Sequence, residues 1–191
     1  MFDLERFVAD CKAGYADGPS HKAVREVLLR ALEEPRSVLK ELGEPARAAI
    51  GTLYRSASLT ILNVVWAPRM TIAPHNHGMW ALIGVYTGRE DNIFWRRLPD
   101  SRIEAAGAQS LCERDAVPLG RDIIHSVTNP IARLSAAIHI YGGDFFAAPR
   151  SEWNPETLTE QPYDSARALQ YFDEANRSLA TTGVSVAKTK V

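Results

Sequence analysis

The sequence predicts a mainly β fold, an antiparallel barrel or sandwich with helices at both ends. Short segments rich in β-branched residues follow one another from about residue 56 to residue 145, and turn residues separate them. Helical spacing of apolar residues is confined to the first fifty residues and to a stretch near the C-terminus. The chain has 191 residues, of which 46% are hydrophobic and 24% charged, and this suits one globular domain.

The N-terminal part is predicted to form helices. One helix begins after Ser20, whose side chain is a suitable cap, and its apolar residues recur at helical spacing. Pro35 opens a short second helix, for which Gly43 is the stop signal. Pro45 is predicted to start a further helical turn that runs to about Tyr54.

The strands are predicted from five segments, which are residues 59–68, 80–98, 102–120, 123–130 and 133–145. The second segment reads as two strands joined by a turn from Gly88 to Asn92. An irregular stretch with three prolines follows over residues 146–163, and a terminal helix follows over residues 165–180. The predicted domain is therefore single, with a helical extension (1–51), a β-barrel (52–150), and a loop with a C-terminal helix (151–191).

Charge, cysteine content and hydropathy narrow the class of protein. The formal net charge is -1, so the chain lacks the positive surplus typical of a general nucleic-acid binder. Cys11 and Cys112 are too few for a disulfide framework, and we expect two reduced thiols. No segment is long and apolar enough to span a bilayer, and the charged N-terminus does not resemble a secretory signal. We predict a cytoplasmic monomer or homodimer that binds neither nucleic acid nor membrane.

The histidines carry the functional signal. His75 and His77 alternate, and alternate residues of a strand face the same side, so both imidazoles can reach one metal ion. Alone, this pair is weak evidence for a metal site, and two ordinary polar residues at a strand edge are the commoner case. His125 follows a turn at Pro118 and Gly120 and is placed to bring a third imidazole from a neighbouring strand. Three histidines on one side of a metal leave the other side open, as in catalytic sites.

These two histidine runs, P-H-N-H and H-S-V-T-N, resemble the two motifs of the cupins, a family of small double-stranded β-helix barrels. The resemblance implies that all three histidines bind a metal. Most cupins add a glutamate ligand near position 81, but Ala81 stands here. Glu90 and Asp91 fall in the next predicted turn and are poor replacements. The implied site therefore has three neutral histidines and no carboxylate.

The missing carboxylate bears on the metal and the substrate. A ferrous ion with three neutral ligands keeps its full charge and favours an anionic ligand such as a thiolate, which a metal deprotonates outright. We expect iron(II) on this argument. Imidazole ligands also suit other metals, and zinc, nickel and manganese stay as alternatives.

A fourth histidine narrows the resemblance. His139 and Tyr141 alternate onto one face, and this run resembles the H-x-Y strand of the thiol dioxygenases, which include cysteine dioxygenase and 3-mercaptopropionate dioxygenase. The resemblance implies that both side chains line the cavity and act in catalysis without binding the metal. The strand of that family carries a serine where Ala137 stands, so the three-residue Ser-His-Tyr proton relay of the family is incomplete here. Leu82 stands where some relatives have a cysteine that crosslinks to the tyrosine.

The resemblance also implies an arginine for the substrate carboxylate, since the planar guanidinium matches that group. Arg55, before the first strand, and Arg150, nine residues after Tyr141, are equally ranked candidates. The predicted function is an iron-dependent thiol dioxygenase that oxidises cysteine or 3-mercaptopropionate to its sulfinate with dioxygen.

Two other functions fit the same histidines. A three-histidine cupin dioxygenase acting on a β-diketone or enol would use an anionic enolate in place of the thiolate, and a cavity without an inward arginine would favour it. A barrel that binds a metal or small ligand without catalysis is the other, because a fold does not determine a function.

Overall fold

The structure is a computed structural model that describes residues 1–18 and 20–182, so the last part of the predicted C-terminal segment, residues 183–191, lies outside the described residues. Three helices open the chain and one closes it, namely α1 (Leu4–Ala16), α2 (His21–Leu32), α3 (Pro35–Leu42) and α4 (Ser165–Thr182). The strands between them are β1 (Ala49–Arg55), β2 (Thr60–Trp66), β3 (Thr71–His75), β4 (Ala81–Thr87), β5 (Arg89–Arg97), β6 (Ile103–Cys112), β7 (Ala116–Leu119), β8 (Ile124–Thr128), β9 (Ser135–Tyr141), β10 (Ser151–Trp153) and β11 (Glu160–Pro162).

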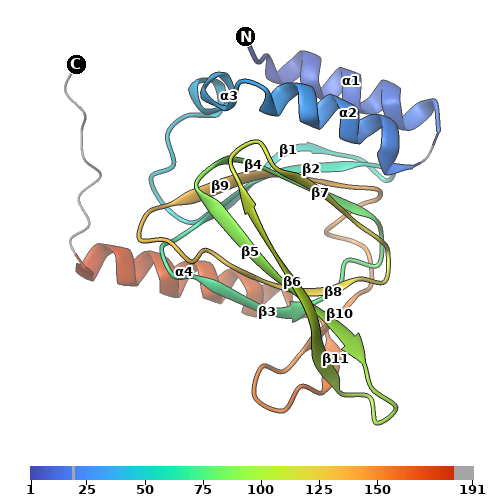
Figure 1. The fold of residues 1–191 in the computed structure, drawn as a ribbon, viewed down its shortest axis with the longest axis vertical. Coiled ribbons are helices and arrows are strands. Elements are labelled where there is room, and N and C mark those ends of the chain that lie inside the picture. The colour runs from blue at the N-terminus through green and yellow to red at the C-terminus, as the bar shows by residue number, and fades with distance from the viewer. Residues whose placement is uncertain (19, 183–191) are drawn as a thin grey trace.

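The strands form two antiparallel sheets that face each other (Figure 1). One sheet has the order β1-β2-β9-β4-β7, and the other has the order β11-β10-β3-β8-β5-β6. From β2 to β9 the chain passes repeatedly from one sheet to the other, and strands from its two ends lie side by side. This order is that of a jelly roll, or double-stranded β-helix. The predicted mainly β barrel with helices at both ends is confirmed.

The N-terminal helices cover the outer face of the first sheet (Figure 1). Ser20 Oγ accepts a hydrogen bond from Lys22 N at 3.4 Å, as expected of a helix cap. The buried face of α2 packs on β4, where Gly84 leaves room for it. A Cβ at Gly84 would lie 2.8 Å from Leu32 Cδ1 and 2.9 Å from Leu28 Cδ1, so only glycine admits this close approach.

The C-terminal helix lies beside β3 (Figure 1). Phe172 stacks on Trp66 of β2, with ring centroids 5.5 Å apart. The Asn176 side chain accepts from Ala48 N at 2.8 Å and donates to Ala48 O at 2.9 Å. The predicted terminal helix is confirmed, and these contacts fix it against the barrel.

Three local predictions are wrong. Residues predicted to form a helical turn from Pro45 instead enter β1, which pairs antiparallel with β2. Pairing at the sheet edge outweighs the weak local preference of an alanine-rich segment for helix. The sequence predicts a turn from Gly88 to Asn92, but only Gly88, with a φ of 84°, lies between β4 and β5, and β5 already begins at Arg89. The stretch predicted as irregular contains β10 and β11, which extend the second sheet.

The cysteines and helices add two findings on the described part of the chain. Cys11 is buried and Cys112 is exposed, and both are free thiols, in agreement with the prediction. Within residues 1–18 and 20–182, no helix combines the length and apolar character that crossing a bilayer requires.

Candidate metal centre

The second sheet brings three predicted histidines together inside the barrel. His75 is the last residue of β3 and pairs across the ladder with His125 of β8, while His77 follows just beyond the end of β3. The ring centroids are 4.7 Å apart for His75 and His125, 4.9 Å for His77 and His125, and 5.1 Å for His75 and His77. Their candidate ligand atoms all lie within 4.8 Å of one another, and no carboxylate among the described residues joins the group.

Hydrogen bonds at the outer nitrogens suit these rings to ligate a metal. His75 Nδ1 lies 2.9 Å from the Ala73 carbonyl oxygen, and His125 Nδ1 lies 2.7 Å from Asn92 Oδ1. Each Nδ1 donates a hydrogen there, which leaves the Nε2 lone pair free to bind a cation. His125 Nε2 and His77 Nε2 are 3.3 Å apart, close to the separation that metal–nitrogen bonds of about 2.0–2.1 Å produce. The residues present therefore fit a metal ion.

Burial keeps the three imidazoles neutral. It lowers the pKa of His75 to about 4, and the nearby positive charge of Arg150 acts in the same direction. Burial also lowers the pKa of His77 and of His125 well below the usual value, and the neighbouring histidines contribute. Neutral imidazole is the form that binds metals, so the site needs no deprotonation near neutral pH.

These shifts predict how the metal-free protein responds to acid. Below about pH 6.5 the unfolded chain binds protons at these histidines while the folded chain does not. The free energy of unfolding is therefore highest above this pH and decreases as the pH is lowered further. As the pH falls through this range, proton binding to each unfolded histidine lowers the free energy of unfolding by up to ~1.4 kcal/mol per pH unit. Urea unfolding of chelator-treated protein at about pH 7.5 and 5.5 measures the loss. His75→Gln should reduce this pH dependence, whereas equal stability at both pH values would contradict the expectation.

The histidines border a small cavity inside the barrel. Its volume is about 40 Å³, close to that of one water molecule in the liquid. Aliphatic and aromatic side chains from both sheets and α4 line the rest of it, including Ile50, Leu62, Val64, Trp66, Ile72, Val127, Phe145, Tyr163 and Ala168. Because this lining is mainly apolar, a polar group inside the cavity acts in a medium of lower dielectric constant than water.

His139 and Tyr141, the predicted catalytic pair, face this cavity from β9. His139 Nδ1 and Tyr141 Oη are 3.1 Å apart, and both side chains are buried. The Tyr141 ring lies 5.0 Å from the His77 ring. Burial raises the pKa of Tyr141 well above its usual value, so the phenol keeps its proton. The pair can therefore hold a proton at the edge of the metal site.

A buried carboxylate lies behind the pair, where the sequence predicted a turn. Glu90 is in β5 with 0% of its surface exposed, and its Oε2 lies 3.3 Å from His139 Nε2. Asn92, the next inward residue of β5, contacts both Glu90 and His125. Sequence reasoning missed both residues, although their alternation with Asp91 is the period of a strand and was a usable signal.

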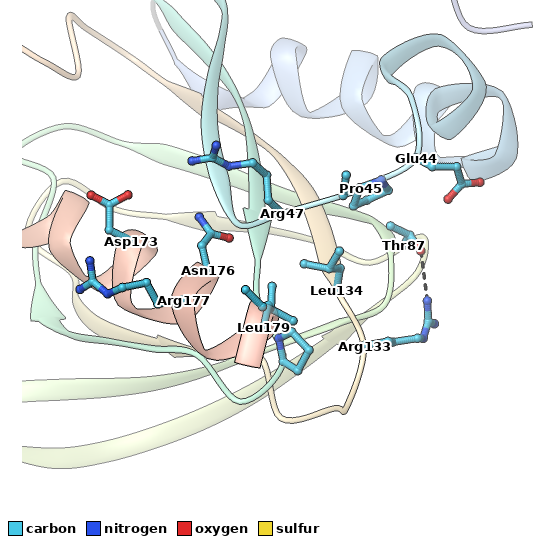
Figure 2. A pocket seen from close by; sticks show the side chains of 13 residues that line it. Glu44, Pro45, Arg47, Thr87, Arg133, Leu134, Asp173, Asn176, Arg177 and Leu179 are labelled. Carbon is cyan, nitrogen blue, oxygen red and sulfur yellow. Dashed lines mark hydrogen bonds between the residues drawn. The ribbon is translucent and has the colours of Figure 1, made fainter. Parts of the chain in front are cut away.

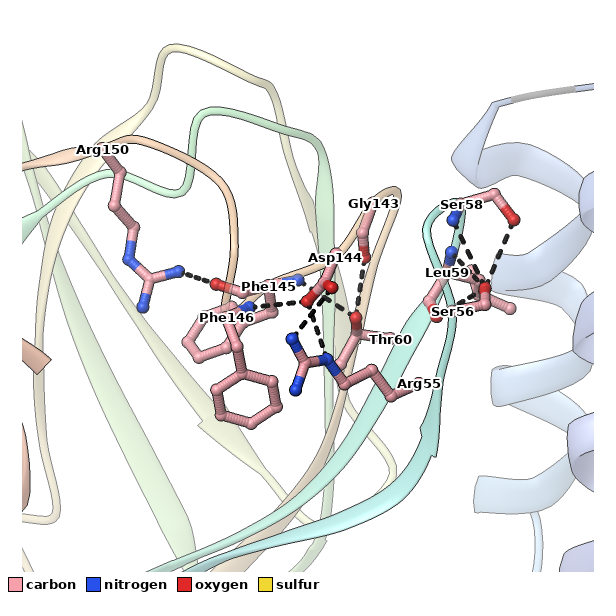
Figure 3. Close-up of polar contacts among 10 residues, drawn as sticks. All are labelled: Arg55, Ser56, Ser58, Leu59, Thr60, Gly143, Asp144, Phe145, Phe146 and Arg150. Carbon is pink, nitrogen blue, oxygen red and sulfur yellow. Dashed lines mark hydrogen bonds and ion pairs between the residues drawn. The ribbon is translucent and has the colours of Figure 1, made fainter.

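Arg150 lies at the edge of the site. Its guanidinium carbon is 3.9 Å from the Phe145 ring centroid and 4.0 Å from that of Tyr163, and Nη1 donates to the Phe145 carbonyl (Figure 3). Its Nε is buried without a hydrogen-bond partner in the described structure. Its positive charge acts to lower the pKa of His75, His77 and Tyr141. Arg150 thus offers a preorganised cation beside the histidines.

Arg55, the other candidate, is engaged elsewhere. Its Nε and Nη2 donate to Asp144 at 2.9 and 3.0 Å, and its guanidinium lies 4.9 Å from the Phe146 ring (Figure 3). This pairing holds the pKa of the Asp144 carboxyl below its usual value. Neither Arg55 nor Arg150 is among the residues that line the cavity, but the two rings that Arg150 contacts, those of Phe145 and Tyr163, do line it. Of the two arginines, Arg150 therefore lies against the wall of the cavity, and Arg55 does not.

A large hollow on the described surface is separate from the histidines. It has a volume of about 820 Å³ and lies among α4, the segment before β1 and the segment before β9 (Figure 2). Arg133 hydrogen-bonds to Thr87 Oγ1, and its guanidinium points away from that of Arg47 (Figure 2). The polar groups that line this hollow do not converge on one point, so the size of the hollow alone does not make it a reaction site.

Comparisons with known proteins find solved structures that are distantly similar to this chain. No known protein family matches the sequence in a comparison with family-wide profiles. An RmlC-like cupin family protein with a double-stranded β-helix fold from Methanocaldococcus jannaschii is 9% identical, with a TM-score of 0.45 over 54% of this chain and 86% of its own. A cupin superfamily protein from Desulfitobacterium hafniense is 15% identical, with a TM-score of 0.44 over 56% of this chain and 88% of its own.

An enzyme appears among the similar structures too. Oxalate decarboxylase from Bacillus subtilis, which has Mn(II) centres, is 13% identical, with a TM-score of 0.38 over 47% of this chain and 22% of its own. The similarity is too distant to transfer an activity. The fold assignment rests on the strand order, and the chemistry has to be argued from the side chains.

Proposed function

We propose that this protein is an iron-dependent thiol dioxygenase acting on a small mercapto acid. The observation that carries the proposal is a group of three neutral histidines at a mainly apolar cavity, with Arg150 packed against Phe145, one of the residues that line it. His75, His77 and His125 would hold the ion, which supplies thiol deprotonation and dioxygen activation when bound. The reaction converts a thiol and dioxygen into a sulfinic acid. Two S–O bonds form, the O–O bond breaks, and sulfur loses the electrons that oxygen gains, so no other reductant is needed.

Arg150 supports a carboxylate on the substrate. Its buried Nε lacks a partner, and an unsatisfied buried donor is costly unless a ligand accepts from it. Its aromatic neighbours on both faces fix the guanidinium plane, which favours recognition of a planar carboxylate. An arginine that reaches the substrate would separate a mercapto acid from a neutral diketone or enol, and Arg150, which packs on two rings of the cavity lining, is the candidate for this role.

The lining of the cavity favours 3-mercaptopropionate over cysteine. An ammonium group would need an acceptor, and no carboxylate lines the cavity. Glu90 lies behind His139, and both of its oxygens already accept hydrogen bonds. A short, amine-free mercapto acid therefore leaves the fewest polar groups unpaired.

Tyr141 and His139 act on the substrate side of the site. The Tyr141 hydroxyl, 3.1 Å from His139 Nδ1, can share its proton with the imidazole or donate it to a group formed in the cavity. The neighbouring Phe145 ring, 4.3 Å from that of Tyr141, keeps the hydroxyl out of bulk water. We assign Tyr141 as the group that stabilises developing negative charge and His139 as its partner.

Oxygen consumption tests the proposal directly. Iron(II)-loaded protein should consume one equivalent of dioxygen per equivalent of 3-mercaptopropionate, and mass spectrometry should show a product with both oxygen atoms from dioxygen. Cysteine should react with a kcat/KM lower by about 10-fold or more, because its ammonium is left unpaired. Protein loaded with zinc instead of iron is the control and should consume no oxygen. A lack of thiol-dependent uptake with 3-mercaptopropionate, cysteine and cysteamine would refute the proposed function.

A further inference from the structure

Glu90 is a buried carboxylate for which the proposed reaction has no direct use. Its side chain is completely covered, and three donors surround it. Trp66 Nε1 donates to Oε2 at 2.9 Å, Asn92 Nδ2 donates to Oε1 at 3.1 Å, and His139 Nε2 lies 3.3 Å from Oε2. A carboxylate is expensive to bury, and these hydrogen bonds offset that expense. Such a group is well placed to control the donors around it.

Two branches leave Glu90 and both reach the candidate metal centre. One runs through Asn92, whose Oδ1 lies 2.7 Å from Nδ1 of His125. The other runs through His139, whose Nδ1 lies 3.1 Å from the hydroxyl oxygen of Tyr141. Both branches are buried. One side chain thus connects a candidate metal ligand with the residue that faces the substrate.

The chemistry of these groups fixes where the hydrogens lie. An ionised carboxylate only accepts, so Asn92 turns its NH2 toward Glu90 and its oxygen toward His125, which then carries its hydrogen on Nδ1. By the same argument His139 carries a hydrogen on Nε2. When His139 is neutral, its Nδ1 is the acceptor for the Tyr141 hydroxyl. A side chain at position 90 with a hydrogen-bond donor in place of Oε1 or Oε2 would disturb the branch through Asn92, the branch through His139, or both.

We propose that Glu90 is a positioning residue that sets the tautomers of His125 and His139 together. It keeps Nε2 of His125 free for a metal and Nδ1 of His139 free for the Tyr141 hydroxyl. The expected effect on catalysis rests on the proposed function. The assignment of the two tautomers rests only on the hydrogen bonds.

Glu90→Gln is the informative substitution because glutamine keeps the shape and adds a donor. With its oxygen toward Trp66 and His139, its NH2 meets the NH2 of Asn92. With the amide reversed, its NH2 meets the donors of Trp66 and His139. Each orientation sets two donors against each other, so one tautomer or amide has to change.

The matched control is the double variant Glu90→Gln/Asn92→Asp, which has the same net charge as the wild type. The glutamine NH2 then donates to the aspartate, and the aspartate still accepts from His125 Nδ1. The glutamine oxygen still accepts from Trp66 and His139. Every hydrogen bond of the network has a counterpart, so the double variant should behave like the wild type.

Nitrogen NMR of the histidine side chains in zinc-loaded protein is the first measurement. We expect a hydrogen on Nε2 of His139 and on Nδ1 of His125 in the wild type and the double variant, and a changed or mixed tautomer at one of them in Glu90→Gln. In iron-loaded protein, kcat for 3-mercaptopropionate should fall about 10- to 100-fold in Glu90→Gln with KM within about 3-fold, and the double variant should recover it.

Three results would overturn the inference. These are a wild-type His139 with its hydrogen on Nδ1, a Glu90→Gln variant with both tautomers unchanged, and a double variant as altered as the single one. The wild-type spectrum tests the inference even if Glu90→Gln does not fold. Failure of the wild-type enzyme to oxidise thiols would refute the proposed function alone, because the zinc-loaded spectra do not depend on turnover.

Discussion

Replacing His77 with alanine is expected to abolish metal binding and the proposed oxygenase activity. His77 Nε2 lies 3.3 Å from His125 Nε2, and the ring is 3% exposed, so water is poorly placed to take its position as a ligand. Mutation of residues that only support a ligand already lowers metal affinity about 10- to 100-fold, and loss of a ligand should exceed this. We expect stoichiometric iron in the wild type, little in His77→Ala, and kcat/KM lower by more than about 100-fold.

Metal analysis after gel filtration and oxygen uptake at equal protein concentration give the two readouts. His21→Ala is the matched control, because His21 lies in α2 near Trp80 and outside the histidine group. It should leave the metal content and the activity unchanged. Circular dichroism of both variants without metal separates loss of the site from loss of the fold. A folded His77→Ala protein that retains one equivalent of iron would show that His77 is not a ligand.

The grouping of the histidines could be predicted because it depends on short-range geometry. His75 and His77 alternate, and His125 lies on a strand that the barrel places beside β3. The periods of helix and strand likewise predict α2, α4 and most of the barrel strands. These features depend on residues close in sequence or on pairing that any antiparallel barrel provides.

The positions of Glu90 and of the two arginines depend on contacts that no local pattern contains. Glu90 is buried because the chain crosses to the second sheet at Gly88 alone, where a Cβ would lie 2.3 Å from Ser135 Oγ. Arg55 is held by Asp144, a residue 89 positions away, and Arg150 is held by the aromatic rings on its two faces. Sequence spacing ranked these arginines equally, and only their tertiary partners distinguish them.

Arg150→Gln is expected to lower kcat/KM for 3-mercaptopropionate by about 100- to 1,000-fold. Truncating one partner of a buried, hydrogen-bonded charge pair costs about 2–5 kcal/mol, and each 1.4 kcal/mol corresponds to a factor of ten. The Phe145 and Tyr163 rings, at 3.9 and 4.0 Å, hold the guanidinium before substrate binds, so little ordering opposes binding. Glutamine keeps a donor but loses the charge and the second parallel hydrogen bond. The loss should come mainly as a higher KM, measured by oxygen uptake over a range of substrate concentrations.

Propane-1-thiol, which has the same chain length and no carboxylate, separates recognition from structural damage. If Arg150 binds the carboxylate, the wild type should oxidise this thiol about as poorly as Arg150→Gln oxidises 3-mercaptopropionate, and the substitution should change its kcat/KM by less than about 3-fold. Arg55→Gln is the second control. It breaks a half-exposed ion pair, which contributes little to stability, and should leave both substrates within about 3-fold of the wild type. An equal loss for both thiols in Arg150→Gln would assign Arg150 to the structure of the site, and a selective loss in Arg55→Gln would assign the carboxylate to Arg55.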